Sequence, residues 1–188
     1  MKTTSAYPVS ARGPADHEVR DQIVAAANEH FSRYGYEETT VSDLAKAIGE
    51  MICANCLREI EAEVGAAVAQ AKQPPEKLRR MFKSITEATL RLLFQDQKLY
   101  EIAASATTER WQAVHAYEER IQKLLRDILQ EGRQSGDFER KTPLDETVTA
   151  IYLVIRPYIN PVLLKSSADD ADEAPVHLSN LVLRSLSP

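Results

Sequence analysis

Apolar residues recur every three or four positions along most of this chain, which is the spacing of amphipathic α-helices. The most regular stretch runs from Trp111 to Gly132 and carries its apolar residues on one side. The same spacing predicts further helices over residues 16–34, 40–49, 50–73, 75–96 and 98–108, one that opens at Pro143, and a last one near residues 178–186. Alternating runs of β-branched residues are few, so the sequence predicts eight helices and no strand. The expected fold class is all-α.

Residues that commonly begin or end helices support these boundaries. Gly35 is expected to end the first helix in the left-handed conformation. Thr40 and Asp43 have the spacing of a capping box, so Thr40 opens a short helix that Gly49 stops. Prolines are expected to interrupt or disturb the chain at Pro74, Pro75, Pro157 and Pro161. Residues 1–14 and 166–173 lack helical periodicity and are expected to be a mobile arm and a solvated loop.

The segment from Val19 to Gly49 carries a set of residues whose order and spacing are more specific than any one of them. The set is Ile23, Ala26, Ala27, Phe31, Gly35, Tyr36, Thr39, Thr40, Val41, Asp43, Leu44, Ala45, Ala47, Ile48 and Gly49. This segment resembles the N-terminal half of the DNA-binding domain in the TetR/AcrR family of bacterial transcriptional regulators. The resemblance implies an arm over residues 1–15, a helix-turn-helix DNA-binding domain over 16–50, and a helical ligand-binding and dimerisation domain over 51–188.

The resemblance also implies a mechanism and a set of partners. A homodimer would hold double-stranded operator DNA as a repressor, and a small-molecule inducer would release it by favouring another conformation. The expected DNA contacts are Tyr36, Thr39, Thr40 and Lys46. Threonine hydroxyls and backbone N–H groups at a helix start can hold a phosphate oxygen, although Thr40 would also cap its helix in any protein.

The family pattern breaks directly after Gly49. The family continues with a turn, a recognition helix and a second turn, which together need about 15–20 residues. Here Gly49 is followed by Glu50 and Met51, in a segment that has no basic residue before Arg58. Either the printed sequence omits a mobile segment or the chain lacks it. We favour an omitted segment, because folded chains rarely lose one central helix of a motif while keeping its partners.

The charge of the chain argues against a protein that coats nucleic acid. The net charge is −5, with 23 basic and 28 acidic residues, and the first 49 residues hold five basic and seven acidic ones. This balance does not exclude a small DNA-reading surface, but its basic residues would have to lie elsewhere. Without a reading helix, the alternative function is a helical protein that binds a small molecule or a partner and has no DNA function.

Candidate residues for a ligand cavity and a dimer interface come from the helices after Pro75. Aromatic and polar side chains that could line an apolar cavity are Phe82, Phe94, Trp111, His115, Tyr117, Tyr152 and Arg156, although core packing is the simpler role for most of them. The last two helices are candidates for a dimerising four-helix bundle, through Val148, Ile151, Ile155, Leu181 and Leu186.

The sequence offers few residues for metal binding, redox chemistry or catalysis. Cys53 and Cys56 lack further ligands for zinc, so they are expected to pack between helices, with a redox pair as the alternative. No catalytic or phosphate-binding motif is present, so neither an enzyme nor a metal or other cofactor is expected. No window is long and apolar enough to span a membrane, and the start does not read as a secretory signal, which predicts a cytoplasmic protein.

Overall fold

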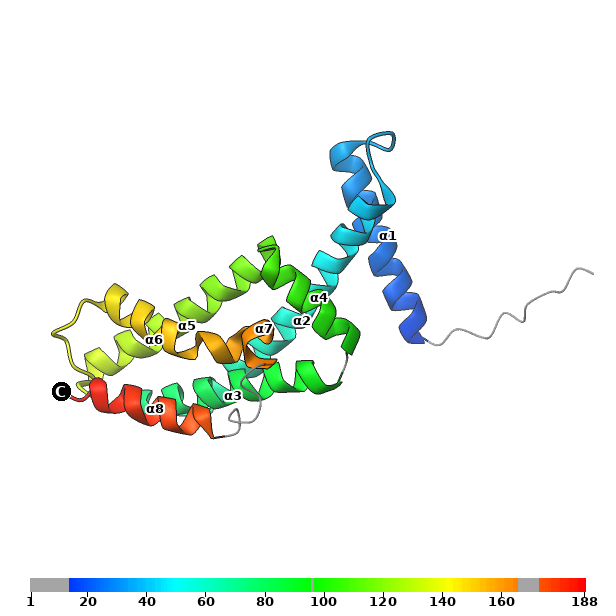
Figure 1. Cartoon of the computed structure of the whole chain (residues 1–188). Coiled ribbons are helices and arrows are strands. Elements are labelled where there is room, and N and C mark those ends of the chain that lie inside the picture. Colours follow the sequence, from blue (N-terminus) through cyan, green and yellow to red (C-terminus); the bar gives the residue numbers. More distant parts are fainter. Residues whose placement is uncertain (1–13, 96, 166–172) are drawn as a thin grey trace, which may run out of the picture. The chain divides into compact units, whose positions relative to one another are not determined.

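The computed structural model describes residues 14–95, 97–165 and 173–188, and leaves out the side chains of residues 14–20, 22 and 93–95. These ranges contain eight α-helices and no strand, so the all-α prediction is confirmed (Figure 1). The helices are α1 (Pro14–Tyr34), α2 (Val41–Ala69), α3 (Pro74–Gln95), α4 (Gln97–Thr108), α5 (Gln112–Ser135), α6 (Leu144–Ile159), α7 (Pro161–Lys165) and α8 (Ala174–Ser185). The predicted arm and acidic loop fall largely on residues 1–13 and 166–172, outside the described ranges.

Backbone geometry and hydrogen bonds confirm two predicted helix boundaries. Gly35 has a φ of 85° and follows α1 in the left-handed conformation that favours glycine. The Thr40 backbone N–H donates to Asp43 Oδ2 over 2.9 Å, and the Asp43 N–H donates to Thr40 Oγ1 over 3.2 Å. This reciprocal pair is the capping box that the sequence predicts at the start of α2.

The predicted break at Gly49 is wrong, because α2 continues through this residue for 29 residues in all. Gly49 and Glu50 are consecutive in the sequence and in this helix, so no turn and no second helix separates them. A glycine inside a helix costs only about 0.5–1 kcal/mol relative to alanine, and good helix formers flank this one on both sides. Gly49 also lies outside the residues with positive φ, so nothing local turns the chain here.

Two prolines near the end of α6 have different effects on the helix. Pro157 lies inside the helix and does not end it, whereas Pro161 begins the short helix α7. Between them, Asn160 Oδ1 accepts hydrogen bonds from the N–H groups of Val162 (3.0 Å) and Leu163 (3.2 Å). The total of eight helices therefore matches the prediction through a different division: two predicted helices are joined in α2, and α7 is additional.

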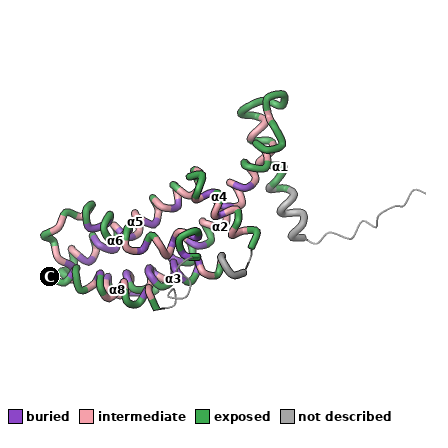
Figure 2. Tube along the Cα trace, in the orientation of Figure 1, coloured by how far each residue is buried: buried purple, intermediate pink, exposed green. Residues whose placement is uncertain are grey.

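The chain divides into two compact units, residues 1–49 and residues 50–188, and the division falls inside α2. The second unit, called the body below, packs α3 against α5, α6 and α8, and α5 against α6. Its core contains buried side chains from five helices, with Val64 from α2, Phe82 and Ile85 from α3, Ile121 and Leu125 from α5, Val148 and Ile155 from α6, and Val182 from α8. Along the body helices, buried positions alternate with half-buried and exposed ones (Figure 2).

The first unit, called the head below, has no comparable core. None of its described side chains between residues 21 and 48 is buried. Two of its large apolar side chains, Tyr36 and Val41, are 80% and 85% exposed. The described head consists of α1, the turn after it and the first nine residues of α2. Two helices of this length can cover only one side of each other, so their remaining apolar faces stay in contact with water.

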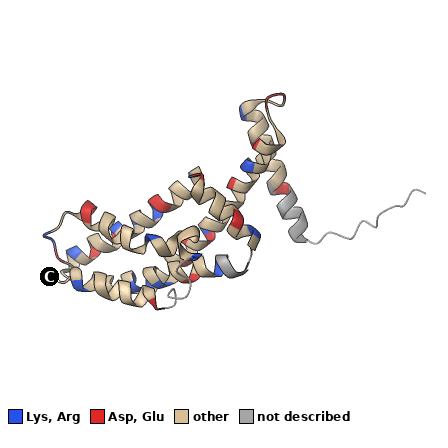
Figure 3. Cartoon of the chain, in the orientation of Figure 1, with Lys and Arg blue, Asp and Glu red and all other residues tan. Residues whose placement is uncertain are grey.

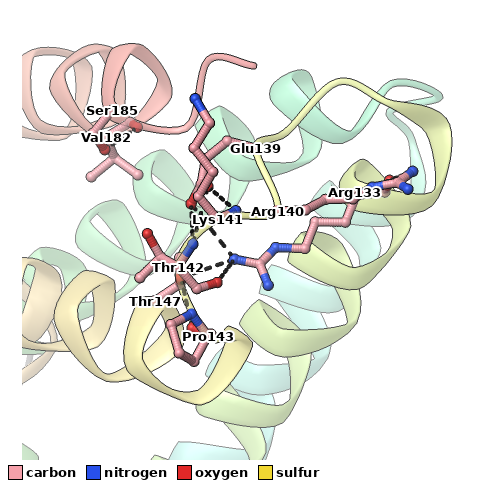
Figure 4. Close-up of polar contacts among 9 residues, drawn as sticks. All are labelled: Arg133, Glu139, Arg140, Lys141, Thr142, Pro143, Thr147, Val182 and Ser185. Atoms are coloured by element: carbon pink, nitrogen blue, oxygen red, sulfur yellow. Dashed lines mark hydrogen bonds and ion pairs between the residues drawn. The ribbon is translucent and has the colours of Figure 1, made fainter.

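A polar network fixes the connection between α5, α6 and α8 in the body (Figure 4). Arg133 Nη2 donates to the Thr142 carbonyl oxygen (2.7 Å) and to Thr147 Oγ1 (3.0 Å), and lies 3.8 Å from a carboxylate oxygen of Glu139. The Glu139 N–H donates to the carbonyl oxygen of Leu186, at the end of α8, over 2.8 Å. This network gives partners to Arg133 Nη2 and to the Thr142 carbonyl oxygen, whereas Arg133 Nε is buried without a hydrogen bond.

Candidate functional site

The predicted DNA contacts Tyr36, Thr39, Thr40 and Lys46 all lie in the head, around the start of α2. Tyr36 is exposed in the turn, and Lys46 is exposed on the helix. The Thr39 hydroxyl donates to the Gly35 carbonyl oxygen over 2.6 Å, and the Thr40 hydroxyl donates to Asp43 Oδ2 over 2.6 Å. Both hydroxyls therefore donate to local acceptors, a backbone carbonyl for Thr39 and the Asp43 side chain for Thr40.

The charge at this helix start is negative. The hydroxyl and the N–H of Thr40 lower the pKa of the Asp43 carboxyl, so it stays ionised at neutral pH. An ionised carboxylate stabilises the positive end of a helix, but it also opposes a phosphate at the same position. The capping role of Thr40 is thus observed, whereas a phosphate contact by Thr40 stays a prediction.

The candidate ligand site is a hollow in the body where α2, α3, α4 and α5 meet the junction of α6 and α7. The hollow is open to solvent, and the cavity itself has a volume of about 30 Å³. Most of its lining is apolar, and the polar contributions come from Thr89, Thr107, Tyr117, Glu118 and Asn160. The full lining is Cys53, Leu57, Ile60, Thr89, Leu92, Ala103, Thr107, Val114, Tyr117, Glu118, Ile159, Asn160 and Pro161. Apolar walls with a few polar groups are typical of small-molecule sites.

Tyr117 is the polar group of this hollow that lacks a partner. Its side chain is 3% exposed, and no hydrogen bond reaches its hydroxyl. Burial raises the pKa of Tyr117 far above its usual range, with smaller contributions from Tyr152 and Glu61, so the hydroxyl stays neutral. A buried hydroxyl without a partner costs free energy that a bound ligand could recover.

The other predicted ligand residues whose side chains are described do not line the hollow. Phe82 belongs to the core, His115 and Arg156 are exposed, and Trp111 Nε1 donates to Glu109 over 2.9 Å. Tyr152 is buried in the core, where burial first and the nearby Glu118 carboxylate second raise its pKa, although no hydrogen bond of normal geometry reaches its hydroxyl. The Phe94 side chain lies outside the described ones.

Sequence reasoning missed the small and polar members of the hollow. Glu118 directly follows Tyr117 on the partly buried side of α5, so a carboxylate beside a buried aromatic was the available signal. Cys53 also lines the hollow, where burial first and the Cys56 thiol second raise its pKa to about 11. Burial likewise raises the pKa of Cys56, so both thiols stay protonated at neutral pH and are weak nucleophiles.

Comparison with known proteins supports a regulator. A sequence model described as "Tetracyclin repressor-like, C-terminal domain" matches residues 74–177, which is more than half of the chain. The chain belongs to the TetR family. It is a ligand-responsive transcriptional regulator, and a repressor role is typical of the family. Regulators of this family bind operator DNA and ligands, act as dimers and are generally not enzymes.

Solved structures of transcriptional regulators show the same fold. The fatty acid degradation regulator FadR from Bacillus halodurans has a TM-score of 0.58 at 20% identity, over 87% of this chain and 97% of that one. The regulator PfmR from Thermus thermophilus has a TM-score of 0.54 at 21% identity, over 86% and 97%. FadR from Bacillus subtilis, solved with stearoyl-CoA, has a TM-score of 0.50 at 21% identity, over 88% and 96%. Among curated proteins, no sequence matches the chain significantly.

Against this family, the continuous α2 is the main departure of the chain. A helix-turn-helix reads DNA by placing its second helix in the major groove, and here no turn and second helix follow residue 49. The rest of α2 is no substitute, because the whole helix carries two basic residues, Lys46 and Arg58, against five acidic ones. Basic residues do not accumulate on the described part of the head (Figure 3).

Most of the predicted dimer residues lie inside the body of a single chain. Val148, Ile151, Ile155 and Leu186 are buried in the core of one chain, so they are not available to a second copy. The prediction chose the most apolar stripe of each helix, and that stripe faces the chain's own neighbouring helices. Leu181 differs, since 61% of it is exposed. The other large apolar residues exposed on α6, α7 and α8 are Leu153, Val162, Leu163 and Val176.

No group of three or more His, Cys, Asp or Glu side chains lies close enough together to hold a metal ion in the part of the chain that the structure describes. No helix within the described ranges is both long and apolar enough to cross a membrane.

Proposed function

We propose that this regulator works through a complete ligand-binding and dimerising body and a head that contacts DNA without reading its bases. The observation that carries the proposal is the unbroken α2, in which Glu50 directly follows Gly49. The hollow and the exposed apolar residues of α6, α7 and α8 all come from residues 53–188, beyond the point where the reading helix is absent. The missing segment therefore removes base recognition but none of the residues proposed for ligand binding or dimerisation.

The head offers contacts to phosphate only. Tyr36, Thr39, Thr40 and Lys46 can approach the DNA backbone, with Lys46 as the one cation among them. Phosphate contacts position a protein on DNA and carry no sequence information, whereas a good bidentate base contact adds about 1–3 kcal/mol of discrimination. We place the protein in the cytoplasm, where it meets DNA.

The body is proposed to form a homodimer through the outer faces of its last helices. Leu153 on α6 and Leu181 on α8 are exposed, large and apolar, and they are our candidates for the centre of the interface. Leu153→Glu and Leu181→Glu should each shift the sedimentation coefficient from dimer to monomer. Gln130→Glu, an exposed position on α5 with the same change of charge, is the control. A dimer that survives both substitutions would contradict this interface.

A second candidate function is favoured by the same unbroken helix. A chain that binds ligand and dimerises but cannot read bases can replace one subunit of a complete relative and weaken that relative's hold on its operator. Specific binding is typically about 10³–10⁷ tighter than non-specific binding, so the loss of one reading head would remove much of it. Mixing the chain with a version carrying an inserted turn and recognition helix after Gly49 tests this, because mixed dimers should lose operator affinity.

The deciding experiment is selection from random-sequence duplex DNA with the full chain. We expect no enriched sequence, together with weak retention that falls as salt rises. Lys46→Ala should reduce the slope of log affinity against log salt by about one, whereas Lys123→Ala on the body should leave it unchanged. An enriched motif would show that bases are read and would overturn the proposed head. No retention at any salt would favour action through a partner alone.

A further inference from the structure

The hollow in the body has a polarity that indicates what kind of molecule fits it. Among the described residues of its lining, Glu118 alone carries a formal charge, and no lysine, arginine or histidine belongs to the lining. The remaining polar atoms are neutral and come from Tyr117, Asn160 and two threonines. The fixed charge of the hollow is therefore negative.

The two threonines are not open to a ligand as donors. Thr89 Oγ1 donates to the carbonyl oxygen of Ile85 over 2.8 Å, and Thr107 Oγ1 donates to that of Ala103 over 2.7 Å. Asn160 Oδ1 accepts hydrogen bonds from the first turn of α7. Tyr117 and Glu118, which are neighbours on α5, are left as the pair that can bind the polar end of a ligand.

Within the described lining, no cation balances Glu118. Nearby on α2 and its neighbours, Glu61 is paired with Arg120, and Arg91 is paired with Glu63. Both of these ion pairs join α2 to a neighbouring helix and lie outside the lining of the hollow. A second carboxylate brought in by a ligand would face Glu118 without compensation, and burying an unpaired charge is costly.

We propose that the hollow binds an apolar amine. The ammonium group donates hydrogen bonds to the Glu118 carboxylate and the Tyr117 hydroxyl oxygen, and the hydrocarbon part contacts the apolar walls. This inference rests on the proposed function, since it names the class of molecule to which the regulator responds. The proposed ligand differs from stearoyl-CoA, the acyl thioester with which FadR from Bacillus subtilis was solved, because the polar end of the proposed ligand is a cation.

The test uses three probes that share one hydrocarbon chain and differ at one end: decylamine, decanol and decanoic acid. Each is titrated into the purified full chain by calorimetry below its aggregation concentration, and without DNA. The expected order of affinity is decylamine, then decanol, then decanoate. If decanoate binds more tightly than decylamine, or if none of the three binds, the proposal is wrong. Because DNA is absent, neither result depends on the head or on operator binding.

Two substitutions test the polar end. Glu118→Gln should weaken decylamine binding by about tenfold to hundredfold, the usual value of a hydrogen bond to a charged group, and leave decanol unchanged. Glu119→Gln, on an exposed neighbouring position of α5, is the matched control and should change neither. If Glu118→Gln binds decylamine as the parent chain does, the ammonium does not lie at Glu118 and the proposal fails.

Tyr117→Phe separates a binding role from a structural one. Removing an unpaired buried hydroxyl should raise the Tm of the ligand-free protein by about 2–4 °C, because its desolvation cost disappears. The same substitution should weaken decylamine binding by about threefold to tenfold. A protein that becomes more stable but binds decylamine less tightly meets both expectations. Unchanged affinity would exclude Tyr117 from the site.

Discussion

The body and the head of this protein are built from the same kind of helix and differ in what covers them. In the body, α3 contacts α5, α6 and α8, and Phe82 at its centre is 1% exposed. In the head, no described side chain from residue 21 to residue 48 is buried. The body helices thus bury complete apolar stripes, whereas the described head helices leave theirs partly in water.

Helix α2 has exposed apolar residues in the head and buried ones in the body, so it shows why the two units differ. Along α2, Val41 is 85% exposed and Leu44 is half-buried, while Ile60 and Val64 are buried. Propensity and periodicity are similar over the two halves, so they do not account for the difference. The number of neighbouring helices does, since most helical stability in proteins comes from packing of an apolar face.

The largest expected difference between the two units is the cost of removing an aromatic side chain. Phe82→Ala should destabilise the body by about 3–5 kcal/mol, since it leaves a cavity in a closed core. Tyr36→Ala in the head should change the free energy of unfolding by no more than about 0.5 kcal/mol, because its ring is mostly in water. Urea unfolding followed by circular dichroism measures both. Equal costs would mean that the head has a core of its own.

A second contrast lies between two glycines of the body. A Cβ on Gly132 would lie 2.0 Å from the Phe138 ring, whereas one on Gly65 meets no heavy atom within 4 Å. Gly132→Ala should therefore destabilise by about 1–3 kcal/mol through overpacking. Gly65→Ala should stabilise by about 0.5–1 kcal/mol, because alanine is the better helix former. Thermal unfolding of the two variants should show shifts of opposite sign, and two shifts of the same sign would contradict this packing.

The polar network of the body predicts a dependence of stability on pH. Burial acts to raise the pKa of Glu139, but hydrogen bonds from Lys141 and Thr142 and the Arg133 charge outweigh it, so the pKa is lowered. A lowered folded-state pKa contributes stability above the unfolded value, and this contribution is lost as pH falls through the folded value. The urea midpoint of the parent chain should fall between about pH 6 and about pH 3.

Glu139→Gln isolates this contribution. The variant should be less stable than the parent near neutral pH and approach it in acid, because the parent carboxyl is protonated there. Glu146→Gln, at an exposed position in the first turn of α6, serves as the control. A constant difference between Glu139→Gln and the parent at every pH would show that the charge of Glu139 does not contribute.

The smallest expected effect is at the cap of α2 in the head. Thr40→Ala removes the reciprocal hydrogen bonds with Asp43 and should cost about 1 kcal/mol of local helix stability. Hydrogen exchange should accelerate over residues 41–44 while the Tm of the body stays the same. Ser42→Ala, in the same first turn, is the comparison. A drop in the Tm of the body after Thr40→Ala would mean that the head and the body unfold as one.

Local features of the chain were predictable from its residues. The left-handed Gly35 and the capping box of Thr40 depend on neighbours a few positions away, and both are found where the sequence predicts them. The start of α3 at Pro74 lies one residue before the predicted start at Pro75. The break at Gly49 was predicted both from the glycine itself and from the resemblance to a family. A lone glycine between helix formers is compatible with a helix, and α2 runs through it.

The sequence by itself determined the helical class, most helix ends and the apolar stripe of each helix, because period and capping are properties of short segments. Only the tertiary structure decided which stripes face the chain's own core, as Val148 and Ile155 do, and which residues stay outside, as Leu181 does. It also decided the hollow, whose lining joins residues as far apart as Cys53 and Pro161. Contacts between distant segments depend on how the helices pack, and no local pattern of residues contains that information.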